Sequence, residues 1–153
     1  MDSHAHRLFL GVSRSVLGRA WRDRLDIAGL GRAEALSQQQ GLPDILARLL
    51  AAGAYLVADD LVQLTPGSGR LYATAVAETG LIELRGNGIF RLATTVGVAV
   101  TLCVELGVDL KGERLPEHGT VVIAGVEIPR LRVDGGAAAL AQILIALTAR
   151  RAY

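Results

Sequence analysis

The amino-acid sequence predicts an α/β or α+β protein that is mostly β, with one helix before the β region and a terminal helix. Helical patterns fill the chain up to Gly53, short β-type runs separated by turn signals follow, and an apolar helical pattern covers residues 137–150. The 153 residues are 51% apolar and 20% charged, with a formal net charge of +1. A chain of this length forms one globular core, and its near-neutral charge gives no electrostatic reason to expect a nucleic acid or membrane partner.

The region before Gly53 is rich in arginine and has helical spacing. Its successive patterns are "RSVLGRAWRDRLD", "RAEALSQQQ" and "GLPDILARLLAAG". In the last of these, Pro43 suits the first turn of a helix and Gly53 suits its end. We therefore expect the chain from about Pro43 onward to pack on a sheet, and residues 1–30 to be peripheral and weakly held.

The region after Gly53 reads as a series of short strands. The runs are "YLVA", "LVQLT", "RLYATAV", "LIEL", "FRLATTVGV", "VTLCVEL", "TVVIAG" and "VEIPRLRV". Cys103 lies inside an apolar run, which predicts a buried and unreactive thiol. With one cysteine no internal disulfide can form, and no run is long enough to span a bilayer, so we expect a cytoplasmic protein.

Two adjacent acids, Asp59 and Asp60, follow the first of these strands. The carboxyl edge of an open α/β sheet is where ligands bind, so the pair is a candidate catalytic and metal-binding site. The alternative is a solvated strand-to-turn transition, in which aspartate side chains bond to nearby backbone amides.

The stretch "GLIELRGNGIF" carries a second group of candidate residues. Glu83 and Arg85 are two residues apart and so lie on one face of a strand, and Gly86 and Gly88 flank a turn. A carboxylate and a guanidinium beside such a turn can hold a metal-bound phosphate, with Glu83 on Mg²⁺ and Arg85 on the anion. A cross-strand salt bridge beside a hairpin turn is the alternative.

Taken together, "YLVADDLVQL", "GLIELRGNGIFRL", "VAVTLCVEL" and "RLPEHGTVVIAGVEIPRLRV" resemble the core of HPr kinase/phosphorylase in its short form. The resemblance covers about residues 53–133, within a predicted core of residues 43–153. It implies a P-loop kinase core related to phosphoenolpyruvate carboxykinase, which uses Mg²⁺ and ATP to phosphorylate a serine of the phosphocarrier protein HPr and so regulates the phosphotransferase system.

The resemblance also implies roles for the candidate residues. Asp59 matches the acid that serves as general base toward the serine and as general acid in the reverse reaction. Asp60 matches its neighbour beside the metal, and Glu83 matches the signature acid associated with Mg²⁺. The remaining signature positions are Arg85, Gly86 and Gly88, which match the loop beside the cofactor.

The chain departs from this family at the nucleotide-binding loop. Such kinases carry G-x-x-x-x-G-K-[ST] before the helix that leads into "VADD", whereas this chain has "ALSQQQGLP" there. Lys111 is its one lysine, and it lies elsewhere. The sequence therefore predicts weak ATP binding and impaired phosphoryl transfer.

Residues 8–53 resemble instead the amino-terminal lead of RecJ-type single-stranded-DNA exonucleases. We accordingly divide the chain into a RecJ-like helical segment, residues 1–42, and a kinase-like core, residues 43–153. Three hypotheses follow: an impaired HPr kinase/phosphorylase-like protein, a non-catalytic binding or regulatory module, and a RecJ-related nucleic-acid-binding fragment. The first implies HPr as partner, and the chain is also a candidate for homo-oligomer formation.

Overall fold

The structure is a computed structural model that describes residues 6–13, 24–30, 42–52, 54–58, 62–76, 80–84, 86–92, 98–134 and 136–148. Its elements are β1 (His6–Ser13), β2 (Arg24–Leu30), α1 (Leu42–Ala51), β3 (Tyr55–Ala58), β4 (Val62–Gly67), β5 (Arg70–Ala75), β6 (Leu81–Leu84), β7 (Gly88–Arg91), β8 (Val98–Ala99), β9 (Leu102–Leu106), β10 (Thr120–Ile123), β11 (Val126–Val133) and α2 (Ala139–Thr148). Strands predominate, with two helices among the described residues, as the sequence predicted.

A six-stranded sheet in the order β10-β11-β9-β1-β2-β3 forms the centre of the fold. The pairs β11–β9 and β2–β3 are parallel, and the pairs β10–β11, β9–β1 and β1–β2 are antiparallel. The strands β2, β3, β9 and β11 therefore all run in the same direction, and their carboxyl ends lie along one edge of the sheet. The strands β4, β5 and β8 form a separate three-stranded sheet, and β6 and β7 form a hairpin.

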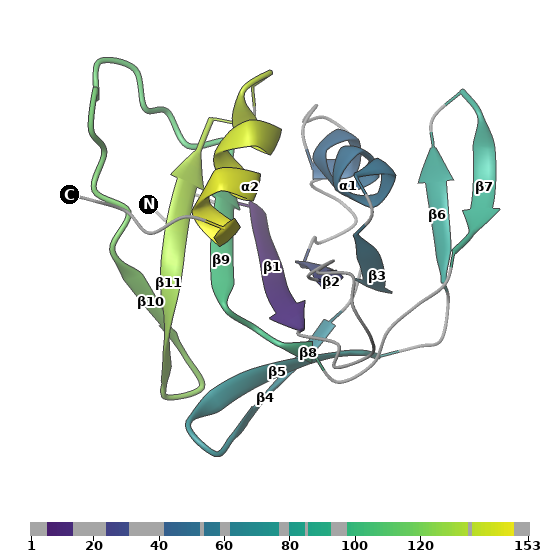
Figure 1. Ribbon diagram of the computed structural model, residues 1–153, viewed down its shortest axis with the longest axis horizontal. Coiled ribbons are helices and arrows are strands. Elements are labelled where there is room, and N and C mark those ends of the chain that lie inside the picture. The colour runs from purple at the N-terminus through teal and green to yellow at the C-terminus, as the bar shows by residue number, and fades with distance from the viewer. Residues whose placement is uncertain are drawn as a thin grey trace, which may run out of the picture.

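Both helices cover one face of the six-stranded sheet (Figure 1). On α1 the buried positions Ile45, Leu46 and Leu49 follow i, i+1, i+4 spacing, which places them on one side of the helix. They join Ala139 and Ile143 of α2 in a core cluster with sheet residues such as Leu8, Leu10, Leu56, Val104 and Val133. The apolar stripe of each helix is thus buried against alternate residues of the strands.

The three-stranded sheet β4-β5-β8 covers the opposite face. Phe9, Val57 and Cys103 point to this side, one position out of phase with Leu8, Leu56 and Val104. They pack in a second cluster with residues of the smaller sheet: Val62, Leu71, Ala73 and Val98. The result is three layers, with helices on one side of the main sheet and a smaller sheet on the other.

The prediction that residues 1–30 are peripheral is wrong for β1. This strand lies between β9 and β2, and the side chains of Leu8, Phe9 and Leu10 are at most 1% exposed. Consecutive residues are buried because both faces of the sheet are covered, so the strand gives a short continuous apolar run instead of an alternating pattern. Three apolar residues between "HR" and "GVS" are too few to distinguish such a strand by pattern alone.

The prediction of a helical segment over residues 1–42 is also wrong for β2. The arginines and aspartates of "RDRLD" fit a helix face, yet Arg24–Leu30 pairs along its length with β1 and through its central residues, Asp26 to Ala28, with β3. Local helix preference is weak, and pairing with two neighbouring strands outweighs it. β2 precedes and β3 follows the predicted boundary between residues 42 and 43, so one sheet contains strands from both predicted segments.

At Gly11 the strand β1 passes close to β8. A Cβ atom at this position would collide with the carbonyl oxygen of Ala99 and the side chain of Val98. The adjacent carbonyl of Leu10 accepts hydrogen bonds from Thr101, from the backbone N–H at 2.8 Å and from the hydroxyl Oγ1 at 3.3 Å. The glycine therefore permits a close contact between the main sheet and the smaller one.

Candidate functional site

The unit β2–α1–β3 positions the first pair of candidate residues. Because β2 and β3 are parallel, their carboxyl ends lie at the same edge of the sheet; in the sequence, residues 31–41 follow β2 and Asp59 follows β3. Parallel strands joined by a crossover helix commonly build ligand sites at this edge. Asp59 and Asp60 themselves lie outside the described residues, as does the connection 31–41.

The strand before the two aspartates is firmly held. Leu56 is fully buried on the helix side, and Val57 is 2% exposed on the other side. Burial on both faces fixes the point at which the chain leaves the sheet. The sequence correctly predicted this strand as "YLVA".

Glu83 lies on β6, opposite Ile89 of β7, and its side chain is exposed. Its neighbour Ile82 is buried in the helix-side core, so the alternation along the strand directs Glu83 away from that core. Glu83 does not share a sheet with β3, the strand that Asp59 and Asp60 follow in the sequence, because β6 belongs to the separate β6–β7 hairpin. Within the described ranges, no group of three His, Cys, Asp or Glu side chains is arranged to hold a metal ion.

The glycines of the signature stretch serve the hairpin turn. The N–H of Asn87 donates to the carbonyl of Leu84 at 2.9 Å, and Gly86 and Gly88 have φ values of 82° and 121°. Side chains strongly disfavour such angles, so the backbone conformation accounts for both glycines. In the part of the chain that is described, no atom lies within 4 Å of where their Cβ atoms would be. Arg85 lies outside the described residues.

Sequence reasoning missed a group of charged residues around Glu105. This carboxylate is on β9 between β1 and β11, and 7% of the residue is exposed. Arg7 Nη2 lies 3.3 Å from Glu105 Oε1, and Arg130 Nη1 lies 3.7 Å from Glu105 Oε2. A buried acid requires compensation by charge or hydrogen bonds. The signal was the single acid inside the apolar run "VTLCVEL", with arginines at alternate positions of "PRLRV".

Cys103 is buried, as the sequence predicted. Burial raises the pKa of its thiol to about 11 from 9.0; Glu105 adds to the rise, while Arg7 and Arg130 oppose it. A thiol with a raised pKa in the folded state contributes stability that is fully present below about pH 9 and is lost as the pH rises toward 11.

We expect the native chain to react with iodoacetamide at pH 8 far more slowly than the urea-unfolded chain, because the reactive thiolate is both scarce and shielded. Mass spectrometry of the alkylated protein over time measures this directly, since Cys103 is the one cysteine of the sequence. The free cysteine in a small peptide serves as the unshielded control. Equal rates for the native and unfolded chain would contradict the expected burial.

No described helix has the length and apolar character needed to cross a membrane. No protein-family model matches the chain, and no curated protein matches it in sequence. Among solved structures, the chain is similar to the Hpr(Ser) kinase/phosphatase from Coxiella burnetii, with a TM-score of 0.63 and 18% sequence identity. The similarity covers 93% of this chain and 91% of that chain. The chain thus has an HPr kinase-like fold, and these comparisons give no support to the RecJ resemblance.

Proposed function

We propose that this chain is an HPr kinase/phosphatase-like protein whose capacity to transfer phosphate from ATP to a serine is impaired. The observation that carries the proposal is the parallel β2–α1–β3 unit within an HPr kinase-like fold. The strands β2 and β3 of this unit end at one edge of the sheet, and in the sequence residues 31–41 follow β2 while Asp59 and Asp60 follow β3. Phosphoryl transfer depends mainly on positioning and charge compensation, which groups following these two strand ends would have to provide.

In this proposal Asp59 takes the proton of the substrate serine, and Asp60 supports a hydrated Mg²⁺ ion. Magnesium keeps several of its waters, so this carboxylate need not contact it directly. The loop Arg85 to Gly88 lies beside the cofactor, and the protein partner is HPr. The chemistry that Mg²⁺ and ATP supply is charge neutralisation and the transferable phosphoryl group.

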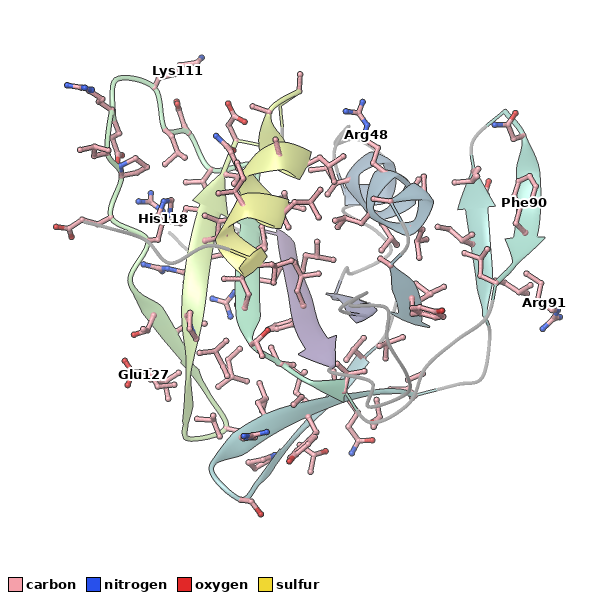
Figure 2. The ribbon with its side chains drawn as sticks, viewed as in Figure 1. Arg48, Phe90, Arg91, Lys111, His118 and Glu127 are labelled. Atoms are coloured by element: carbon pink, nitrogen blue, oxygen red, sulfur yellow. The ribbon has the colours of Figure 1, made fainter. Side chains whose placement is uncertain are left out.

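The impairment follows from the residues that replace the phosphate-binding loop. The connection "GRAEALSQQQG" contains no lysine and no G-K-[ST], and Pro43, in the first turn of α1, lacks a backbone N–H. Lys111 lies in the loop after β9, which is separated from β2 by β1 in the sheet order. In Figure 2 it extends outward at the tip of that loop. The glycine-rich sequence and the lysine of a P-loop are thus missing from this connection, although α1 begins directly after it.

We expect isothermal titration of the chain with Mg-ATP to show affinity weaker than that of a P-loop kinase by orders of magnitude. Each lost charge-assisted hydrogen bond is worth on the order of 1.5–3 kcal/mol, and several are lost together. Transfer of radiolabelled phosphate from ATP to HPr should be slight or absent. Micromolar affinity together with transfer that disappears in Asp59→Asn would show that the site is intact and the impairment proposal wrong.

A variant in which residues 31–41 are replaced by a loop carrying G-x-x-x-x-G-K-S provides the matched test of the fold argument. It should gain Mg-ATP affinity, since β2 and α1 flank the loop as in a P-loop unit. If the folded variant gains none, the kinase interpretation of this edge fails.

Binding of HPr without any phosphate transfer, by either the unmodified chain or the variant, would favour the alternative, a non-catalytic binding or regulatory module. For that alternative, the exposed side chains of Ile89 and Phe90 on β7 offer an apolar surface.

A further inference from the structure

Three arginines lie on β1 and β11, the two strands that flank Glu105 of β9, on the sheet face opposite the helices. Arg7 of β1 is in register with Glu105 of β9, and Glu105 is in register with Arg132 of β11. Arg130, two residues before Arg132, lies on the same face. Since Leu131 and Val133 face the helix-side core, the arginines face the other way.

The side chains of the two β11 arginines are held by the backbone that precedes β10. Arg130 Nε donates to the carbonyl of His118 at 2.6 Å, and Arg132 Nη1 donates to the carbonyl of Glu117 at 3.3 Å. The N–H of Arg132 in turn donates to His118 Nδ1 at 3.0 Å. His118 lies beside β11 in Figure 2. These contacts orient the arginines before any ligand arrives.

Among the described residues, the ion pairs of this group leave an excess of positive charge. Three guanidinium groups pair with two carboxylates, the buried Glu105 and the exposed Glu113, whose Oε2 is 4.0 Å from Arg132 Nη1. Each guanidinium has five N–H donors, so the three groups together have more donors than the contacts with these two carboxylates and two carbonyls use. The arginine side chains are 43%, 31% and 26% exposed for Arg7, Arg130 and Arg132, so they are reachable from solvent and partly desolvated.

We propose that Arg7, Arg130 and Arg132 bind a phosphate group, either as inorganic phosphate or as a phosphate monoester. Arginine pairs with phosphate through two parallel N–H···O bonds, and guanidinium groups on the two strands that flank β9 can offer such pairs of donors to different oxygens of a tetrahedral anion. Glu105 acts as a positioning residue, because it holds Arg7 and Arg130 beside one another. Arg7 is in register with Leu30 at the end of β2, so this group lies at the same carboxyl edge of the sheet as the proposed ATP site. Its test uses phosphate without Mg-ATP, so the failure of one proposal is distinguishable from the failure of the other.

The test is a titration of the full ¹⁵N-labelled chain with sodium phosphate, against sodium chloride at equal ionic strength, followed by backbone amide shifts. Saturable shifts at Glu105, Arg130 and Arg132 with phosphate, and none with chloride, are expected. A second titration with a phosphoserine peptide, against its serine counterpart, separates a monoester ligand from free phosphate. Absence of saturable binding to either probe overturns the proposal.

Variants decide which side chains are responsible. Arg7→Gln and Arg132→Gln should each weaken phosphate binding about tenfold or more, because each removes a charge-assisted contact. The phosphate affinity of Arg7→Lys should lie between that of the unmodified chain and that of Arg7→Gln, since lysine keeps the charge but lacks the planar pair of N–H donors of a guanidinium. The control is Arg70→Gln, at the exposed turn of the β4–β5 hairpin, and it should bind as the unmodified chain does.

If Arg70→Gln weakens binding as much as the others, the effect is general charge attraction and the proposal is wrong. It is equally wrong if Arg7→Gln and Arg132→Gln bind phosphate normally. A thermal melt without phosphate checks that each variant is folded. If Arg7→Gln unfolds, phosphate binding by Arg132→Gln still tests the proposal. The guanidinium of Arg132 contacts Glu113 and the carbonyl of Glu117, and its contacts are separate from those between Arg7 and Glu105.

Discussion

Replacing Phe9 by alanine is expected to lower the free energy of unfolding by about 3–5 kcal/mol, enough to unfold much of a marginally stable protein. Phe9 is 1% exposed and packs between the main sheet and the smaller β4-β5-β8 sheet. Its removal would leave a cavity in a rigidly packed layer that relaxes only in part. Urea denaturation followed by circular dichroism measures the change.

The matched control is Ile89→Ala on β7, where the isoleucine is 69% exposed. Its effect should stay within about 0.5 kcal/mol, as is usual for surface positions. The comparison tests the central place of β1 directly. Similar midpoints for Phe9→Ala and Ile89→Ala would mean that β1 is peripheral after all.

Replacing Gly11 by valine is expected to lower the free energy of unfolding by about 1–3 kcal/mol or more. The added side chain would collide with the carbonyl of Ala99, which belongs to the backbone and cannot rotate away. The collision would push β1 and β8 apart and strain the hydrogen bonds between Leu10 and Thr101. Chemical denaturation at constant temperature gives the difference.

Gly67→Val serves as its control. Gly67 is also in a strand, and the atoms nearest to the place where its Cβ would lie belong to Tyr72, the nearest at 3.5 Å, an ordinary contact distance. The same substitution should therefore be tolerated there. If both variants lose the same stability, the loss reflects glycine replacement in general and the close contact at Gly11 is not the cause.

The sequence predicted most elements from α1 onward because they have local signals; the exceptions are β7 and β8, since the single predicted run "FRLATTVGV" overlaps both. The helix α1 has an apolar stripe with Pro43 in its first turn, and the β4–β5 turn has "PGSG", where Ser68 and Gly69 take positive φ values. The terminal helix was predicted over 137–150 and is observed at Ala139–Thr148. In these places local preference and tertiary packing agree.

The order of strands could not be predicted in the same way. The strand β1 pairs with β9, some ninety residues later, as the bond between Thr101 and Leu10 illustrates. No local pattern specifies such a partner, and the charges around β2 favour a helix. The candidate acids were found because "VADD" follows a clear strand, whereas the group at Glu105 depends on pairing between three strands distant in the chain.

The place of β1 also bears on how the protein folds during synthesis. β1 leaves the ribosome well before β9, which ends at Leu106, so β1 lacks its neighbour on that side until β9 has emerged. Until then β1 and β2 lack the neighbour that covers the exposed edge of β1, and β11 must still add beyond β9. A nascent chain with an open apolar edge is prone to pair with other chains. Contacts between residues so distant in sequence also form slowly. We therefore expect the sheet to be completed late in folding, and the nascent strands β1 and β2 to need protection until then.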